Sequence, residues 1–303
     1  MFLEVKNVTK SIHGDVVIKN VSLCSERGRV IGLRGINGSG KTMLMRLISG
    51  LIRPTKGQVL IDGEVVSKDI PFPRSLGVLI EGPAFLDDYS AMDNLKLIAY
   101  PKGKVAEDEI RAVLSEVRLD PKSRKKYKKF SLGMKQRLGI ANAILHDPEL
   151  LILDEPTNGL DPIGIAEVRN FIKDLSVDRG KTILISSHIL SEIALLADDI
   201  GIIDHGVLLE ESSMEDLEKK NRKYIQLQVS DVPKASLILE RQFHVTDYAV
   251  QDEHSLRLYD TALDMAAINK ALVVQDVAVI SSQICNDTLE DYFKQITGGE
   301  GIA

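Results

Sequence analysis

The sequence predicts an α/β fold: a parallel sheet with helices on its faces, a helical insertion, and a small C-terminal α+β domain. Three observations support this prediction. Short β-rich runs alternate with turn residues over residues 1–65. Residues 85–148 have mostly helical spacing of their apolar side chains. From residue 149, strand and helix patterns alternate, which is typical of a parallel sheet covered by helices.

The first 65 residues should form four strands and one helix. We expect strands at 2–6, 15–23 and 29–34, the last running into a glycine-rich loop. A helix should begin at Thr42 and end near Gly50, because Gly50 and the Pro54 beyond it do not continue a helix. Residues 59–62, followed by Gly63, indicate a strand and a hairpin turn.

The middle of the chain should contribute helices first and the parallel strands next. Ser90 with Asp93 three residues later fits a helix capping box. Two further helices are expected at 107–119 and 133–145. The alternating region then predicts strands at 150–153, 182–186 and 200–203 and helices at 164–178 and 189–197.

The C-terminal part is separated by a stretch at 211–222 in which Glu and Lys dominate, and we interpret this stretch as a break. Mixed strand and helix patterns return in residues 223–303, and we interpret that part as a small accessory domain. The patterned segments there are 224–229, 255–259, 263–272 and 277–284.

Composition excludes some classes of protein. The formal net charge is −6, which argues against non-specific binding of nucleic acid, because neutralising phosphates requires a surplus of Lys and Arg. Cys24 and Cys285 lack CxxC spacing and suit free thiols in a reducing compartment. We expect neither a signal peptide nor a membrane span, so any work at a membrane would need another chain.

One motif predicts phosphate binding. The run Gly35-Ile36-Asn37-Gly38-Ser39-Gly40-Lys41-Thr42 fits G-x-x-x-x-G-K-[ST] and lies between a predicted strand and a predicted helix. Glycines allow backbone N–H groups to approach phosphate oxygens, and the helix N-terminus adds partial positive charge. We expect Lys41 to reach the β- and γ-phosphates of a nucleotide and Thr42 to bind Mg²⁺.

Two other strand ends carry polar residues. Asp154 and Glu155 follow the apolar run 150–153, at the carboxyl end of a strand, where ligands bind in open α/β sheets. We expect Asp154 to hold the Mg²⁺ shell and Glu155 to be the general base for an attacking water. His188 ends the next strand and could contact the γ-phosphate, although a lone His is more often structural.

These motifs together resemble the ABC ATPase family. Ser131-Leu132-Gly133-Met134-Lys135-Gln136 lies where the family has its signature sequence, and Asn158-Gly159-Leu160-Asp161 matches the family's D-loop. The resemblance covers about residues 1–215 and implies a P-loop NTPase core with a helical subdomain at about 85–148. It also implies ATP and Mg²⁺ as cofactors. In the implied head-to-tail homodimer, Ser131 and the Gly133 backbone would cover ATP bound by the other copy.

The sequence departs from the family pattern at three positions. Leu132 stands at a position that is Gly in the usual signature. Glu81 stands at the Q-loop position, where we expect it to contact the metal and to act in catalysis, unless it is only a solvated loop acid. His13 stands where an aromatic residue usually stacks on adenine, and a surface turn is the alternative. Glu81 and the signature together resemble the ATPases of bacitracin resistance and lantibiotic self-immunity.

The resemblance implies the ATP-hydrolysing subunit of an ABC transporter that exports a peptide antibiotic. Such a subunit would work with transmembrane permease subunits, peripherally on the cytoplasmic face of the membrane. The rival hypothesis is a soluble regulatory or translation-associated ATPase. Only the basic run 122–129 favours it, and that run is also typical of a solvated loop. Translation-type members usually carry two cassettes, and this chain has one.

Overall fold

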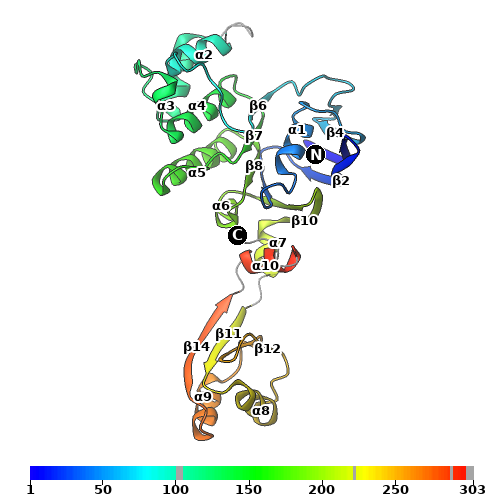
Figure 1. The fold of residues 1–303 in the computed structure, drawn as a ribbon, viewed down its shortest axis with the longest axis vertical. Coiled ribbons are helices and arrows are strands. Elements are labelled where there is room, and N and C mark those ends of the chain that lie inside the picture. Colours follow the sequence, from blue (N-terminus) through cyan, green and yellow to red (C-terminus); the bar gives the residue numbers. More distant parts are fainter. Residues whose placement is uncertain (100–104, 221–222, 287–288, 298–303) are drawn as a thin grey trace. The chain divides into compact units, whose positions relative to one another are not determined.

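The chain divides into two compact units, residues Met1–Glu215 and Asp216–Ala303 (Figure 1). The computed structural model describes residues 1–99, 105–220, 223–286 and 289–297. Each unit has its own hydrophobic core. Among the described residues, no helix is both long and apolar enough to cross a bilayer.

The N-terminal strands form an antiparallel sheet in the order β2-β1-β4-β5. Its members are β1 (Leu3–Ile12), β2 (Asp15–Ser25), β4 (Lys56–Ile61) and β5 (Glu64–Val65). The strands expected at 2–6, 15–23 and 59–62 are therefore confirmed, although β1 and β2 extend further than their apolar runs.

A second sheet carries the motif-bearing strands, in the order β10-β9-β3-β8-β7-β6. They are β3 (Val30–Arg34), β6 (Leu76–Leu79), β7 (Leu150–Asp154), β8 (Thr182–Ser187), β9 (Asp199–Asp204) and β10 (Val207–Ser213). All neighbours pair in parallel except β10, which pairs antiparallel with β9. Every residue of β3, β7 and β8 is buried, as expected for strands covered on both faces.

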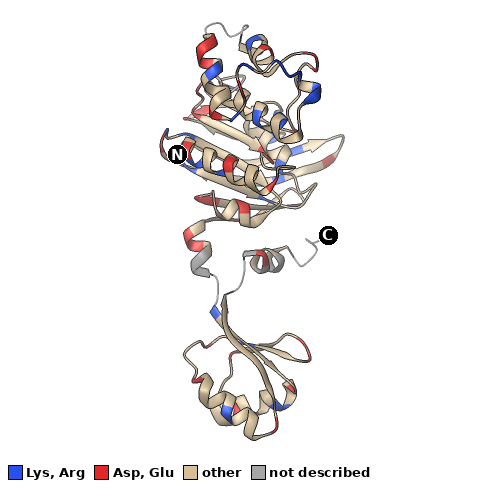
Figure 2. Ribbon diagram, turned by 90° about the vertical axis from the view of Figure 1, so that its left-hand side faces the viewer, with Lys and Arg blue, Asp and Glu red and all other residues tan. Residues whose placement is uncertain are grey.

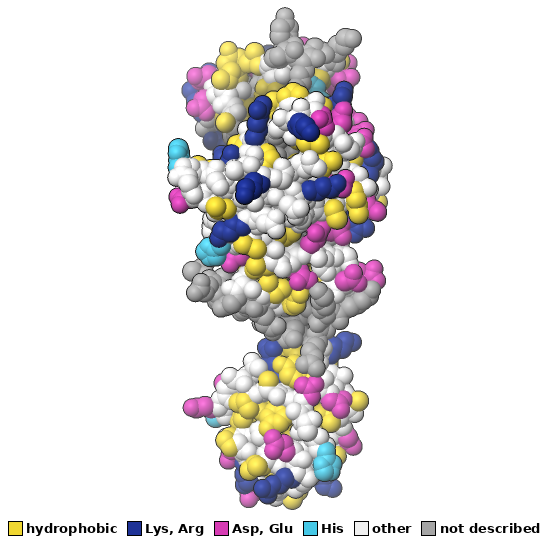
Figure 3. All heavy atoms as spheres, turned by 90° about the vertical axis from the view of Figure 1, so that its right-hand side faces the viewer, with side chains coloured by type: hydrophobic (Ala, Val, Ile, Leu, Met, Phe, Trp, Pro, Cys, Tyr) yellow, Lys and Arg dark blue, Asp and Glu magenta, His cyan; other side chains and the backbone are white. Residues whose placement is uncertain are grey.

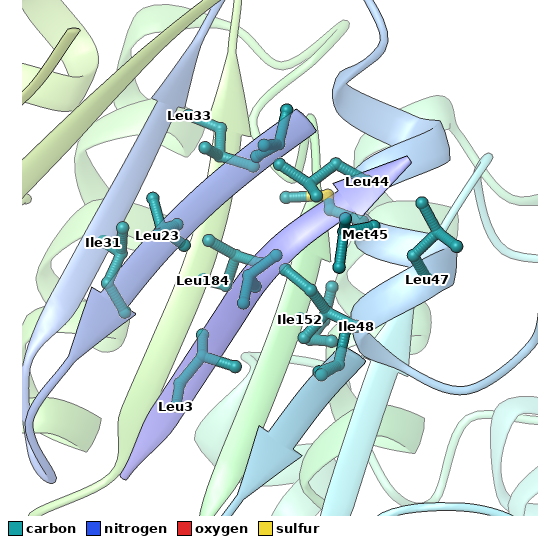
Figure 4. Packing of buried hydrophobic residues seen from close by; sticks show 14 of the residues in the cluster. Leu3, Leu23, Ile31, Leu33, Leu44, Met45, Leu47, Ile48, Ile152 and Leu184 are labelled. Carbon is teal, nitrogen blue, oxygen red and sulfur yellow. The ribbon is translucent and has the colours of Figure 1, made fainter. Parts of the chain in front are cut away.

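Helix α1 (Lys41–Ile48) packs between the two sheets (Figure 4). Its Leu44, Met45 and Ile48 join side chains from both sheets, including Leu3 of β1 and Ile152 of β7. Because the first residue of α1 directly follows the glycine-rich loop, this packing fixes the loop against the parallel sheet.

The helical region contains α2 (Ala91–Ala99), α3 (Glu107–Glu116) and α4 (Leu132–Ile144), as the spacing predicted. Ser90 caps α2: its hydroxyl accepts a hydrogen bond from Asp93 N at 3.2 Å and donates one to the Asp93 carboxylate at 2.6 Å. Two further helices, α5 (Pro162–Val177) and α6 (Leu190–Ala194), lie at the positions expected between strands.

The break expected at 211–222 contains the boundary between the two units, which falls between Glu215 and Asp216. Part of that stretch nevertheless has regular secondary structure. Residues up to Ser213 complete β10, and α7 (Met214–Lys220) follows. Met214 and Leu217 are buried, so a narrow apolar face is present among the charged residues. The sequence did not predict α7, because two apolar residues are too few to give a helical pattern in a stretch dominated by Glu and Lys.

The C-terminal unit has a β-α-β-β-α-β core. Its elements are β11 (Lys223–Val229), α8 (Val232–Phe243), β12 (Tyr248–Val250), β13 (Ser255–Leu258), α9 (Met265–Val274) and β14 (Val279–Asn286), followed by α10 (Leu289–Ile296). The strands form one antiparallel sheet, ordered β12-β13-β11-β14. One apolar core joins this sheet to α8 and α9. This arrangement is the split β-α-β fold.

On the face seen in Figure 3, Lys and Arg side chains are interspersed with acidic and apolar ones. The lysines of the run 122–129 include Lys126 and Lys128, which form ion pairs with Asp88. These two lysines therefore share one carboxylate of the same chain.

Candidate functional site

A cavity of about 540 Å³ lies at the carboxyl ends of the parallel strands. Three strand ends contribute to it: the loop after β3 with the start of α1, Glu81 beyond β6, and Asp154 with Glu155 at the end of β7. Its remaining lining comes from β2 and from the β9–β10 turn, through Val16, Val17, Lys19 and His205. The structure therefore gathers most of the residues predicted from the motifs in one place.

The loop after β3 is shaped by its glycines. A Cβ at Gly35 would lie 2.3 Å from Ser39 Oγ and 2.4 Å from the Ile203 carbonyl oxygen, so no side chain fits there. Gly38 and Gly40 have φ values of 82° and 110°, which favour glycine. Within the described part of the chain, the buried Ser39 hydroxyl has no hydrogen-bond partner. Together with the open α1 N-terminus, this loop can accept an anion.

Lys41 is folded against the loop that precedes it. Its ammonium donates hydrogen bonds to the carbonyl oxygens of Gly35 at 2.7 Å and Ile36 at 3.1 Å, and the residue is 6% exposed. Burial lowers the pKa of Lys41, and the nearby carboxylates of Glu155 and Asp154 partly offset this effect. A desolvated cation interacts more strongly with an anion than an exposed lysine would.

The carboxylate of Asp154 is held by two hydroxyl groups. Thr42 Oγ1 donates to its Oδ2 at 2.7 Å, and Ser186 Oγ donates to its Oδ1 at 2.5 Å. Ser186 stands beside Asp154 in the β7–β8 register, which places the hydroxyl there. The Ser186 hydroxyl also accepts a hydrogen bond from Glu155 N at 2.9 Å. Strand pairing therefore positions both acidic residues.

This donor set fits Mg²⁺. The Thr42 hydroxyl and the Asp154 carboxylate are adjacent oxygen ligands on the cavity wall, of the kind that Mg²⁺ prefers. No cluster of three or more His, Cys, Asp or Glu residues suited to a metal occurs among the described residues. Mg²⁺ commonly binds one or two protein ligands together with substrate phosphates and water, so this sparse set suits a nucleotide-bound ion.

Besides Ser186, Glu155 contacts His188, Lys41 and Gln136. Its Oε2 lies 2.8 Å from His188 Nδ1, and its Oε1 lies 3.7 Å from Lys41 Nζ, an ion-pair distance too long for a hydrogen bond. Its carbonyl oxygen accepts a hydrogen bond from Gln136 Nε2 of α4 at 3.1 Å. Its φ of 47° is left-handed, a strained conformation that non-glycine residues adopt mainly where surrounding contacts enforce it.

Glu81 lines the cavity and lies beside a basic residue of α1. Its carboxylate forms an ion pair with Arg46, which lies on α1 four residues after Thr42. The Glu81 side chain is 57% exposed, and φ is 61° at this residue. Glu81 therefore connects the segment after β6 to the helix of the phosphate loop.

The structure does not bring His13, Ser131 and Gly133 into this cavity. His13 is an exposed residue in the turn between β1 and β2, outside the cavity lining. Ser131 and Gly133 line a separate cavity of about 460 Å³ at the start of α4, together with Leu160 and Asp161. Ser131 caps α4 by accepting a hydrogen bond from Met134 N at 3.3 Å.

Comparison with known proteins identifies the family. Residues 18–158 match the model described as ABC transporter. The chain is 42% identical over 302 residues to the bacitracin transport ATP-binding protein BcrA of Enterococcus faecalis, covering 99% of this chain and 98% of that protein. It is 43% identical over 301 residues to BcrA of Bacillus licheniformis, again covering 99% and 98%.

The chain belongs to the ABC transporter ATP-binding proteins. It is also 42% identical over 214 residues to the lantibiotic transport ATP-binding protein SrtF of Streptococcus pyogenes, covering 70% of this chain and 91% of that protein. Among solved structures, an ATP-binding subunit of an ABC transporter has a TM-score of 0.65 at 30% identity, covering 73% of this chain and 93% of that one. The predicted fold and ATPase activity are thus confirmed, and the soluble rival is not supported.

Three residues of this ABC ATPase site were not assigned from the sequence: Ser186, Gln136 and Arg46. Ser186 could have been found from its place at the end of the strand that pairs with β7. Arg46 could have been found from its spacing. It lies four residues after Thr42, and residues four apart lie on the same face of a helix. Gln136 required the fold, since only the packing of α4 brings it to Glu155.

Proposed function

We propose that this ATPase powers the export of a peptide antibiotic of the bacitracin or lantibiotic type. The observation that carries the proposal is the 42–43% identity to two bacitracin transport proteins over 99% of the chain. This similarity extends through the C-terminal unit, so it exceeds what a shared ATPase cassette would give. Residues 1–215 would be the ATPase domain and residues 223–303 an accessory domain.

ATP would bind in the cavity at the end of β3. Backbone N–H groups of Gly35, Asn37, Gly38, Ser39 and Gly40 would face the phosphates. Lys41 would leave its carbonyl partners for the β- and γ-phosphates, exchanging neutral acceptors for charged ones. The adenine would lie on the β2 side, where Val16 and Val17 offer apolar surface, with His13 in the preceding turn.

The catalytic roles follow from the contacts around β7. Thr42 and Asp154 would hold Mg²⁺, with Glu81 as a further oxygen ligand, and the bound ion would neutralise phosphate charge. Glu155 would accept the proton of the attacking water. His188 would orient the Glu155 carboxylate through the 2.8 Å contact and could also reach the γ-phosphate.

The working unit would be a homodimer. Ser131 and Gly133 lie at a cavity of their own, apart from the phosphate loop of the same chain. A second copy arranged head to tail would place them over bound ATP. Two such copies would work with transmembrane permease subunits at the cytoplasmic face of the membrane, and no nucleic-acid partner is expected.

The ion pair of Glu81 with Arg46 suggests how the permease would sense nucleotide. When MgATP enters, Glu81 would exchange Arg46 for the metal, and the segment that follows β6 would move with it. The pair is partly exposed and therefore weak, which allows exchange at low cost.

The experiment compares drug resistance in cells with the ATPase rate of the purified complex. Deleting the gene in its host should abolish resistance to the peptide, and the wild-type gene should restore it. Glu81→Ala should bind ATP normally but restore little resistance, and Glu81→Gln should be intermediate because it keeps an oxygen ligand without the charge. Unchanged resistance after deletion would refute the transport proposal. Full activity of Glu81→Ala in both assays would refute only the coupling role.

A further inference from the structure

The C-terminal sheet ends in a long strand without charged residues. β14, with the sequence Val-Ile-Ser-Ser-Gln-Ile-Cys-Asn, is an outer strand, and among the described residues β11 is its only strand neighbour (Figure 1). In Figure 2 the ribbon of this strand has neither the blue of Lys and Arg nor the red of Asp and Glu. An unpaired edge of this kind is a template for pairing with another strand.

The other outer strands carry features that hinder such pairing, and β5 and β6 have only two and four residues. β2 has Asp15 and Lys19, and β10 has Glu210 and Glu211. β12, at the opposite edge of the C-terminal sheet, is only three residues long. Charge and short length are the usual means by which proteins protect sheet edges, and β14 has neither.

Two isoleucines on β14 are unusually exposed for apolar residues in a strand. Ile280 is 65% exposed and Ile284 is 66% exposed. Ile284 stands beside Ile225 of β11, whose side chain is in the core, so it lies on the sheet face that the helices cover. The pairing of β14 with β11 is regular from Ser281 to Asn286, and the register shifts at Ile280.

We propose that two copies of this chain pair through β14, antiparallel across a twofold axis at Ser282. A twofold axis perpendicular to the sheet reverses strand direction and keeps both sets of helices on the same face. Centred on Ser282, it sets Ile280 opposite Ile284 of the second copy, and the reverse. Both exposed isoleucines then gain an apolar cross-strand partner, and no charged residue meets another.

The contact between two β14 strands is small, so it needs a partner that is already held nearby, and a second copy of the chain meets this requirement. One strand pair buries less than the roughly 1,200 Å² of a stable interface, so it would be weak alone. The proposed ATPase dimer already joins two copies, which raises the local concentration of each β14 to about the millimolar range. The contact would thus keep the copies associated when the ATP sites open, and it requires no nucleotide.

Cysteine crosslinking of the full-length protein tests the pairing. In a background with Cys24→Ser and Cys285→Ser, single cysteines replace Ser281, Ser282 or Gln283, and the protein is oxidised without nucleotide. Directly opposite residues have Cα atoms about 4.5–5.5 Å apart, within disulfide range, whereas diagonal ones are about 7–8 Å apart. We expect Ser282→Cys to give at least about fivefold more covalent dimer than its two neighbours.

A charge on the edge should abolish this crosslink. Ile284→Lys in the Ser282→Cys protein should reduce the dimer to the level of the neighbouring positions, because two lysines would enter the apolar contact. Val250→Lys is the matched control, since Val250 is 55% exposed on the opposite edge strand, and it should have no effect.

The outcomes separate this inference from the proposed function. Equal crosslinking at all three positions, none at Ser282, or an equal loss with Val250→Lys would overturn the pairing through β14. ATP-dependent dimerisation of Glu155→Gln, followed by sedimentation, tests the ATPase dimer independently of β14. A sedimenting dimer without the Ser282 crosslink would leave the proposed function intact and refute this inference.

Discussion

Lys41→Ala tests whether the loop after β3 binds phosphate. Lys41 is the buried cation of the cavity, and its nearest groups are two carbonyl oxygens and the Glu155 carboxylate. Lys41 and a bound phosphate would form a buried, hydrogen-bonded charge pair. Removing one member of such a pair costs about 2–5 kcal/mol. The substitution also leaves Glu155 and Asp154 without their nearby positive charge, which adds repulsion toward the phosphates.

We therefore expect ATP to bind Lys41→Ala about 3 kcal/mol more weakly, which corresponds to roughly a 100-fold higher Kd. Titration with a fluorescent ATP analogue measures this change directly. Lys41→Met should behave alike, because it keeps the aliphatic stem and removes only the charge and its hydrogen bonds.

Lys19→Ala is the matched control for Lys41→Ala. Lys19 lines the same cavity but is exposed, so its charge is screened and its loss should cost at most about 1 kcal/mol. Circular dichroism would show that each variant is folded. A Kd for Lys41→Ala within fivefold of the wild-type value would refute the phosphate-binding interpretation of the loop, since a fivefold change in Kd corresponds to only about 1 kcal/mol of binding free energy. An equal effect of Lys19→Ala would refute it as well.

Other residues of the chain give four further predictions. Glu155→Gln should retain ATP but hydrolyse it at least about 100-fold more slowly in a phosphate-release assay, and near-normal turnover would mean that another group activates the water. Ser186→Ala removes the partner of Glu155 N and of the Asp154 carboxylate, so the free energy of unfolding should fall by about 2–4 kcal/mol; an unchanged urea midpoint would contradict this. Gly77→Ala places a Cβ 2.0 Å from the Ala143 carbonyl oxygen and should lower stability by about 1–3 kcal/mol through displacement of α4, measured as a lower Tm. A chain that ends after Lys220 should fold and bind ATP. A product that is insoluble or does not bind ATP would show that the C-terminal unit belongs to the ATPase core.

Most strands of the ATPase unit could be predicted because a buried strand requires a run of apolar residues that are adjacent in the sequence. β7 and β8 are buried on both faces, and their continuous apolar runs record this. The phosphate loop was predictable because its backbone shape needs glycine at fixed positions, as the Gly35 contacts show. In both cases the residues that reveal the structure are adjacent in the sequence.

The contacts that complete the site were harder to predict because they join distant segments. The Arg46–Glu81 pair joins residues on α1 and beyond β6, and its existence depends on how those elements pack. Helix α8 in the C-terminal unit was missed although Asp231 caps it by accepting a hydrogen bond from Lys234 N at 2.9 Å. Pro233 is the second residue of this helix, and a Pro in the first turn is compatible with a helix start, which the sequence-based prediction did not use.

The hydrogen bond from Gln136 to the Glu155 carbonyl has a consequence for turnover. Gln136 lies on α4 five residues after Ser131. One helix therefore joins the backbone of Glu155, the proposed general base, to the residue that would cover the ATP of the other copy. A shift of Glu155 after hydrolysis would therefore displace a contact in the opposite site. Two sites linked in this way would show cooperative kinetics, with a Hill coefficient above one for ATP, and Gln136→Ala would make them independent.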